Sequence, residues 1–260
     1  MKTVITLFFI VLYFLGFSQD LPSVKIGNQI WSKKNLDTTI FRNGEVIKEI
    51  HSKEDWLKAG YREEPAWCYY NFDSKNANLG KLYNYYAVSD PRNIAPLGWK
   101  VPSLQDYYAL VKFLDPLCTT EYFEKNGSLT GGNLKSKDSL WNGRVCPQIN
   151  SNFNAIPAGG YSPSIDYPNF DWNKKGENAR LWCITNWDSI VLFTYSDTSN
   201  IEEFKRKIKS EKLKDKAIVI RLYNYSCKID ADDDPKLCGY SLRLLKQFGE
   251  KPEEYIFPDK

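Results

Sequence analysis

The sequence predicts one α+β domain in which long loops connect a few short strands and helices. Three observations support this fold class. Short runs of alternating apolar residues occur in the N-terminal and C-terminal parts, two stretches combine helical periodicity with capping residues, and Gly, Asn, Pro and Ser turns dominate the middle of the chain. Aromatic residues form 15% of the chain, and each ring can bury about 150 to 250 Å² and so anchor irregular backbone.

The N-terminal residues 1–18 have the pattern of an export signal. One lysine precedes an apolar stretch from Val4 to Phe17, which is shorter than the roughly 20 apolar residues that span a bilayer. The alternative is an uncleaved N-terminal anchor. We expect a secreted, periplasmic or cell-surface protein whose single domain covers residues 19–260, with no transmembrane segment after signal cleavage.

Three elements are predicted in the N-terminal half. Residues 24–31 alternate around a Gly-Asn turn, which is typical of a β-hairpin. Residues 52–59 begin with a capping serine and stop at Gly60, which indicates a short helix. The second main helix covers residues 104–114, because Ser103 can cap it and its apolar residues recur at 3.6-residue spacing.

Three more elements are predicted toward the C-terminus. Residues 200–216 place apolar side chains on one face under a charged surface, which indicates an amphipathic helix. That helix either packs on the domain with a solvated outer face or binds a polyanion. Residues 217–223 form a β-rich apolar run, and residues 240–245 are expected to form the final strand.

Charge and histidine content exclude several classes of function. The formal net charge is +3, and no basic stripe of the kind that binds nucleic acid is present. The only histidine is His51. A Ser-His-Asp triad or Cys-His pair would have to use it, yet no nucleophile motif accompanies it, and no phosphate loop or dinucleotide fingerprint occurs. We therefore expect an ordinary surface histidine and no catalytic residue.

Six cysteines follow the leader, and their even number permits three disulfides in an oxidising compartment, with 15 possible pairings. Their irregular spacing lacks the paired C-x-x-C steps of a zinc site. We expect structural bridges, and the nearest pair in sequence, Cys227 and Cys238, is the first candidate. The candidates are Cys68, Cys118, Cys146, Cys183, Cys227 and Cys238.

An acidic run offers a weak calcium hypothesis. Asp230, Asp232 and Asp234 present carboxylates at alternating positions, which a calcium ion could use. An EF-hand loop needs Gly at its sixth position and Glu at its twelfth, whereas this run has Pro235 and Ser241 there. The alternative is a solvated acidic turn without a metal, and we expect no other cofactor.

Two tryptophans are candidate ligand contacts. Trp172 and Trp187 are flanked by Asp and Asn residues, and a flat apolar ring next to amides and carboxylates suits the mixed surface of a sugar. The alternative is that both rings pack in the core and fix loops in place. The expected partner is an extracellular glycan or an envelope protein.

The order of the motifs resembles the Fibrobacter succinogenes major paralogous domain family over roughly residues 24–246. The matching strings are Val24 to Trp31, Lys34 to Asp37, Arg42 to Gly44, Ala66 to Tyr70, Gly80 to Val88, Ala95 to Ser103, Asn152 to Tyr161, Ala179 to Thr185 and Gly239 to Arg243. Residues 196–216 look like an insertion relative to shorter members. Leu244 stands where the family usually has a cysteine, which implies that Cys238 takes over a bridge.

The resemblance implies a C-type-lectin-like fold, similar to that of formylglycine-generating enzymes, with a small twisted antiparallel sheet, two main helices and long ordered loops. For function, the resemblance implies only a secreted or surface module whose relatives often bind ligands. It implies no more than this, because a fold alone does not fix a function. Our first hypothesis is a non-catalytic binding or scaffold module. The second is a formylglycine-generating-type oxidase that uses a cysteine pair, although no matching motif surrounds Cys227 or Cys238.

Overall fold

A computed structural model of the chain describes six ranges of residues: 21–118, 130–137, 140–143, 151–163, 172–184 and 215–247. Several predictions concern residues outside these ranges, namely the export signal at 1–18, almost all of the helix and insertion at 196–216, Cys146 and Trp187. Within the described ranges, no helix is long and apolar enough to cross a membrane.

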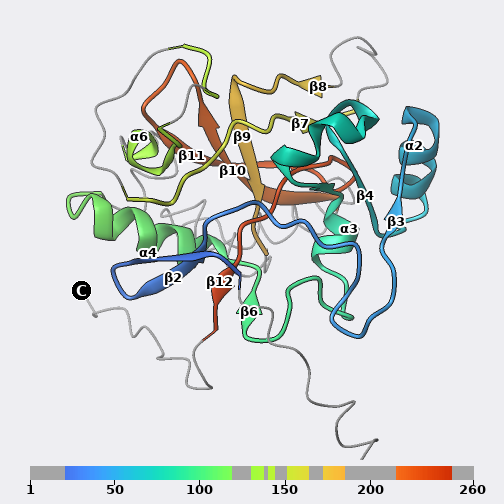
Figure 1. Ribbon diagram of the computed structural model, residues 1–260, viewed down its shortest axis with the longest axis horizontal. Coiled ribbons are helices and arrows are strands. Elements are labelled where there is room, and N and C mark those ends of the chain that lie inside the picture. The colour runs from blue at the N-terminus through green and yellow to red at the C-terminus, as the bar shows by residue number, and fades with distance from the viewer. Residues whose placement is uncertain are drawn as a thin grey trace, which may run out of the picture.

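The described ranges combine short strands with short helices, as the sequence predicts for an α+β chain (Figure 1). The strands are β1 (Ser23–Ile26), β2 (Gln29–Ser32), β3 (Lys48–Glu49), β4 (Ala66–Cys68), β5 (Leu82–Tyr83), β6 (Trp99–Lys100), β7 (Gly160–Tyr161), β8 (Trp172–Asn173), β9 (Asn178–Trp182), β10 (Lys216–Tyr223), β11 (Ile229–Pro235) and β12 (Leu245–Lys246). The α-helices are α2 (Lys53–Tyr61), α3 (Tyr85–Val88), α4 (Leu104–Leu114) and α6 (Gly131–Leu134), and the 3-10 helices are η1 (Tyr70–Phe72) and η2 (Ser74–Leu79).

The strands form several small, mainly antiparallel sheets. Their orders are β1-β2-β12-β6, β11-β10-β9, β3-β4-β5 and β7-β8, and only the β3–β4 pair is parallel among these. The segment Gly239–Ser241 joins three of the sheets, because Gly239 bridges to β7, Tyr240 bridges to β5 and Ser241 bridges to β9. This segment therefore runs through the centre of the fold between sheets that are far apart in sequence.

The three N-terminal predictions are confirmed. β1 and β2 form an antiparallel hairpin, whose turn residue Gly27 has a positive φ of 59° that favours glycine. The Ser52 side chain accepts the Asp55 backbone N–H at the start of α2. Ser103 caps α4 in a complete capping box with Asp106, which satisfies backbone donors that a helix N-terminus leaves unpaired.

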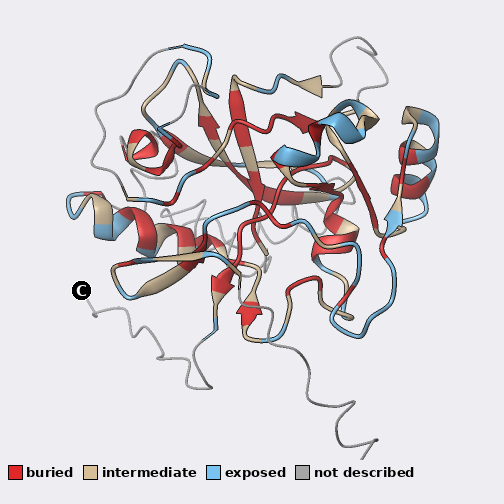
Figure 2. Ribbon diagram, in the orientation of Figure 1, coloured by how far each residue is buried: buried red, intermediate tan, exposed pale blue. Residues whose placement is uncertain are grey.

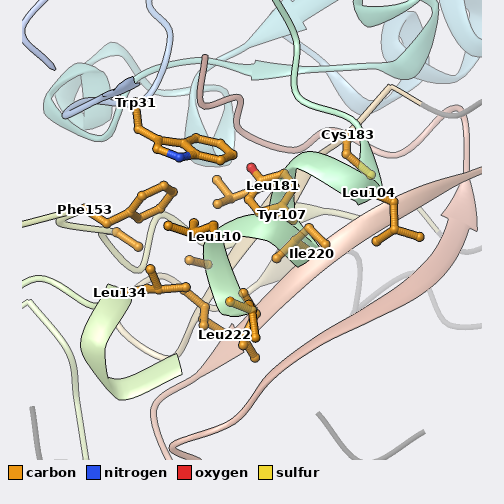
Figure 3. Close-up of a cluster of buried hydrophobic side chains, with 14 of the residues drawn as sticks. Trp31, Leu104, Tyr107, Leu110, Leu134, Phe153, Leu181, Cys183, Ile220 and Leu222 are labelled. Carbon is orange, nitrogen blue, oxygen red and sulfur yellow. The ribbon is translucent and has the colours of Figure 1, made fainter. Parts of the chain in front are cut away.

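The main apolar core lies between α4 and one face of the β9–β10–β11 sheet. Tyr107 and Leu110 of α4 share a cluster with Leu181 of β9 and with Ile220 and Leu222 of β10 (Figure 3). All five side chains are at most 2% exposed. Figure 2 shows the burial along β9 and β10 and the exposed outer side of α2. The apolar run predicted for residues 217–223 thus has a physical cause, since Ile220 and Leu222 of β10 pack with the α4 core and Val219 on its other face enters a second apolar cluster.

Arg243 is a fully buried side chain at the centre of the fold. Its guanidinium donates to the Asn35 side chain at 2.9 Å and to the backbone oxygens of Ser32 at 2.8 Å, Phe153 at 2.9 Å and Asn154 at 2.7 Å. Burial lowers the pKa of Arg243 to about 10. The last residue of the Gly239 to Arg243 motif therefore links β2 with a distant loop and has a structural role.

Two strand predictions need correction. The acidic run at 230–234 is not a turn, because it forms most of β11 and pairs with β10. The final strand β12 covers only two residues, Leu245–Lys246, instead of 240–245. Residues 239–241 form isolated bridges on both sides, and the backbone then turns to place Arg243 in its buried site.

Candidate functional site

Trp172 belongs to an aromatic cluster on η1, β7 and β8. The Trp172 ring centroid lies 4.9 Å from that of Tyr70, 5.2 Å from that of Phe72 and 4.4 Å from that of Tyr161. Its neighbour Asn173 donates to the Ser162 hydroxyl at 2.8 Å, which fixes the β7–β8 pair. The candidate Trp172 is thus half-buried, and its contacts with three rings hold η1 against the β7–β8 pair.

A polar groove of about 470 Å³ lies next to this cluster. Its volume is within the range of about 300 to 1,000 Å³ that is usual for ligand sites. The lining residues come from η2, the turn before β9 and two loops: Lys75, Asn76, Asn78, Leu79, Leu140, Asn142, Pro157, Lys175 and Gly176. The Lys175 backbone N–H donates to the Tyr70 hydroxyl at 3.4 Å, so one wall of the groove contacts the aromatic cluster.

Asn76 fixes the geometry of the groove. Its side chain is only 8% exposed, and its amide nitrogen donates to the Tyr70 backbone oxygen at 2.9 Å. Its amide oxygen accepts from the Lys175 ammonium at 2.7 Å. The 3-10 helix η2 that carries Asn76 is started by Asp73, whose side chain accepts the Lys75 backbone N–H. A buried amide with both atoms bonded is a rigid support for a charged group.

Gly176 allows the close approach of two groove walls. Its φ of 84° favours glycine, and a Cβ there would lie 2.4 Å from the Asn142 amide nitrogen. The Asn142 backbone N–H donates to the Gly176 oxygen at 2.7 Å, and the Gly176 N–H donates to the Pro157 oxygen at 2.8 Å. These contacts hold the turn before β9 against the loop that contains Asn142.

The groove provides hydrogen-bonding groups and positive charge. Carboxamides of Asn78 and Asn142 offer donors and acceptors, and Lys75 and Lys175 offer ammonium groups. No cysteine, histidine, aspartate or glutamate is among the described lining residues. This arrangement offers hydrogen bonds and positive charge to a polar ligand.

Most of the predicted disulfides are wrong. The side chains of Cys68, Cys118, Cys183 and Cys238 are buried thiols outside any disulfide, which leaves at most one bridge among six cysteines. Cys227 is assigned as disulfide-bonded, but the predicted Cys227–Cys238 pair does not form. The even number of cysteines suggested three bridges, whereas these four thiols behave as small apolar core residues.

Burial makes the described thiols poor nucleophiles. It raises the pKa of Cys68 well above the usual thiol value, and it raises the pKa of Cys238 to about 12 despite hydrogen bonds from Tyr240 and Ser162. A reactive cysteine needs an accessible site that stabilises the thiolate. Neither residue has one.

The acidic run presents its alternate carboxylates on the face of β11 away from α4. Asp234 accepts from Arg180 at 3.0 Å and from Arg221 at 2.9 Å, and Arg221 also binds Asp232. A calcium ion at Asp230, Asp232 and Asp234 would have to displace Arg221, and no group of three metal-binding side chains was found within the described ranges. Calcium binding there remains a prediction.

Four buried polar atoms on this same sheet face have no hydrogen-bond partner within the described ranges. They are Asn178 Oδ1, Arg180 Nε, Arg221 Nε and Asp230 Oδ1. Burial is the main cause that raises the pKa of Asp230, although the positive charge of Arg221 opposes it. Ordered water commonly satisfies such atoms.

His51 lies on the surface before α2. Its side chain is 72% exposed, and its Nδ1 is 3.7 Å from Glu49. Neither residue lines the groove.

Sequence reasoning missed the groove because its residues come from η2, a turn and two loops that are separated in sequence. The available signal was the polar run Ser74 to Asn78 and the Lys174-Lys175-Gly176 turn. Nothing in either string shows that the two lie side by side.

One known protein family matches the chain. The family model of the Fibrobacter succinogenes major domain matches residues 24–246. No curated protein matches the chain. No solved structure matches it either.

Proposed function

Since the chain belongs to the Fibrobacter succinogenes major domain family, we propose that it is a secreted, non-catalytic binding module that recognises a glycan at the cell envelope. The observation that carries this proposal is the polar groove beside the Trp172 cluster. The export pattern of residues 1–18 supports the extracellular location. The family resemblance supports a C-type-lectin-like arrangement of the helices and small sheets.

Glycan recognition is supported by the mixture of groups at the groove. Sugars present hydroxyls that both donate and accept hydrogen bonds, and the carboxamides of Asn78 and Asn142 can match both. Sugars also present apolar C–H faces, which can stack on aromatic rings. Tyr70, whose hydroxyl contacts Lys175, and Trp172, which packs on Tyr70, are half-buried rings beside the groove and outside its lining.

The non-catalytic part of the proposal is supported by the thiols. A formylglycine-generating-type oxidase needs an accessible, reactive cysteine pair, whereas the four thiols in the described ranges are at most 2% exposed. A buried thiol of high pKa holds little thiolate near neutral pH. A scaffold that binds an envelope protein is the remaining alternative, and a glycan array separates it from glycan binding.

The proposal is tested by screening the full chain on a glycan array that includes envelope and plant polysaccharides. We expect selective binding that weakens at least tenfold in Asn78→Ala and Asn142→Ala, because a lost hydrogen bond of about 1.4 kcal/mol changes affinity tenfold. Asn43→Ala is the matched control, since Asn43 is an exposed amide outside the groove lining. Absence of any glycan binding, or equal loss in all three variants, contradicts the proposal.

A further inference from the structure

Building on the proposed glycan-binding role, we propose that the groove selects acidic glycans, and that Lys75 and Lys175 contact a ligand carboxylate. The charge of the groove indicates the class of ligand, which its shape alone does not. The preferred ligand is a saccharide that contains uronic acid.

The charged side chains among the described lining residues of the groove are all positive. Lys75 and Lys175 line it, and no described lining residue is acidic. Two acids lie near the lining residues in sequence, and both have partners: an Asp73 carboxylate oxygen accepts the Lys75 backbone N–H at the start of η2, and the Glu177 carboxylate lies 3.7 Å from the Lys174 ammonium. Neither lysine side chain forms an ion pair with any described residue. Two uncompensated ammonium groups beside one cavity favour an anion over a neutral ligand.

Lys175 is positioned by contacts that leave part of its ammonium available. An ammonium has three donors, and one of them is bonded to the buried Asn76 oxygen at 2.7 Å. The Lys175 nitrogen also lies 5.7 Å from the centre of the Tyr70 ring, within the range of a cation–π contact. This support reduces the side-chain entropy that a flexible surface lysine loses when it binds a ligand.

Lys174 provides an internal comparison. It precedes Lys175 in the same turn but does not line the groove, and its ammonium lies 3.7 Å from the Glu177 carboxylate. The adjacent lysines therefore differ in their position relative to the groove and in whether the ammonium has an acidic partner. Lys175 faces the groove and has no acidic partner, whereas Lys174 has an acidic partner outside the groove.

The expected effect is moderate because the groove is open to water. Exposed ion pairs are weakened by the high dielectric and by salt. We expect about a tenfold loss of affinity for an acidic oligosaccharide when both groove lysines are replaced by glutamine, and a similar loss when salt rises from about 0.05 to 0.5 M. Affinity for a neutral oligosaccharide should depend little on either change.

The experiment compares three probes by calorimetry on the full chain: a galacturonic acid oligomer, a sulfated oligosaccharide and a neutral cello-oligosaccharide of equal length. The variants are the Lys75→Gln/Lys175→Gln pair and the control Lys174→Gln, each checked for native melting temperature. The inference predicts that the galacturonic acid oligomer binds best, that the double variant loses this preference and that Lys174→Gln retains it.

Each other outcome has a defined meaning. If the neutral probe binds as tightly as the acidic one, or if the double variant binds the acidic probe like the native chain, the acidic selectivity is refuted while glycan binding stands. Preference for the sulfated probe alone refutes the carboxylate assignment. If none of the probes and no array glycan binds, the proposed function fails as well.

Discussion

Replacing Arg243 by lysine should destabilise the fold strongly although the positive charge is kept. The planar guanidinium donates to four separate acceptors, and the side chain is fully buried. A lysine ammonium is a compact group that cannot reach all four. At least one or two buried oxygens then lose their donor, and each costs about 1 to 3 kcal/mol. We therefore expect Arg243→Lys to lower the free energy of unfolding by about 2 to 4 kcal/mol.

The assay is urea denaturation followed by tryptophan fluorescence, because Trp31, Trp56, Trp99 and Trp182 are fully buried. Arg42→Lys is the matched control. Arg42 likewise donates to several backbone oxygens, those of Ala95, Pro96 and Trp99, but it is exposed, so water can replace its bonds. Arg42→Lys should change stability by less than about 1 kcal/mol. If the two variants have the same unfolding midpoint and slope, the structural role assigned to Arg243 is wrong.

Two further predictions concern charge and thiols. Burial raises the folded-state pKa of Asp230 above that of an unfolded aspartate, so ionising it costs stability as pH rises through the folded pKa. Asp230→Asn should therefore be more stable than the native chain at pH 7, with the difference vanishing below about pH 4; a difference that grows toward low pH contradicts this. In a colorimetric thiol titration, Cys68, Cys118, Cys183 and Cys238 should react only after denaturation, because all four are buried. Rapid labelling of any of them in the native protein would show an accessible thiol.

Turn and capping residues were sufficient to predict the N-terminal hairpin and the two helices α2 and α4. The hairpin at Gly27 and the helices after Ser52 and Ser103 each depend on a turn or capping residue within a few positions. β10 was predicted from its apolar run, because α4 covers one face and part of the other enters a second core cluster. Such elements can be read from one stretch of sequence.

The acidic strand could not be predicted in this way. Consecutive aspartates have low strand propensity, so residues 230–234 suggest a turn. In the fold, Ile229 and Ala231 face the core on one side of β11, while Arg180 and Arg221 neutralise the carboxylates on the other. These arginines lie on two other strands, and their proximity depends on tertiary pairing. Long-range charge compensation overrides the local preference.

The cysteines show a different limit of sequence reasoning. An even count after an export signal permits three bridges, but it does not place any two sulfur atoms near each other. Cys118 and Cys183 lie in the α4 core, whereas Cys68 and Cys238 belong to two other apolar clusters. The core is therefore built by aromatic and aliphatic packing, and most of the thiols contribute to it as apolar side chains.

The family motifs contain residues that pack and bond in the core. The groove is lined mainly by residues outside these motifs. Gly239 is packed so that a Cβ would lie 2.9 Å from the Trp56 ring, and Arg243 bonds four buried acceptors. By contrast, Lys75 of the short 3-10 helix η2, Asn142 and Lys175 lie in segments between the matching strings. A core residue is constrained by many neighbours, whereas a loop residue on a fixed scaffold can change without unfolding it. The family match therefore reports on the scaffold. Under the proposed acidic-glycan binding, we expect family members with other residues at positions 75 and 175 to differ in their affinity for a galacturonic acid oligomer measured by calorimetry.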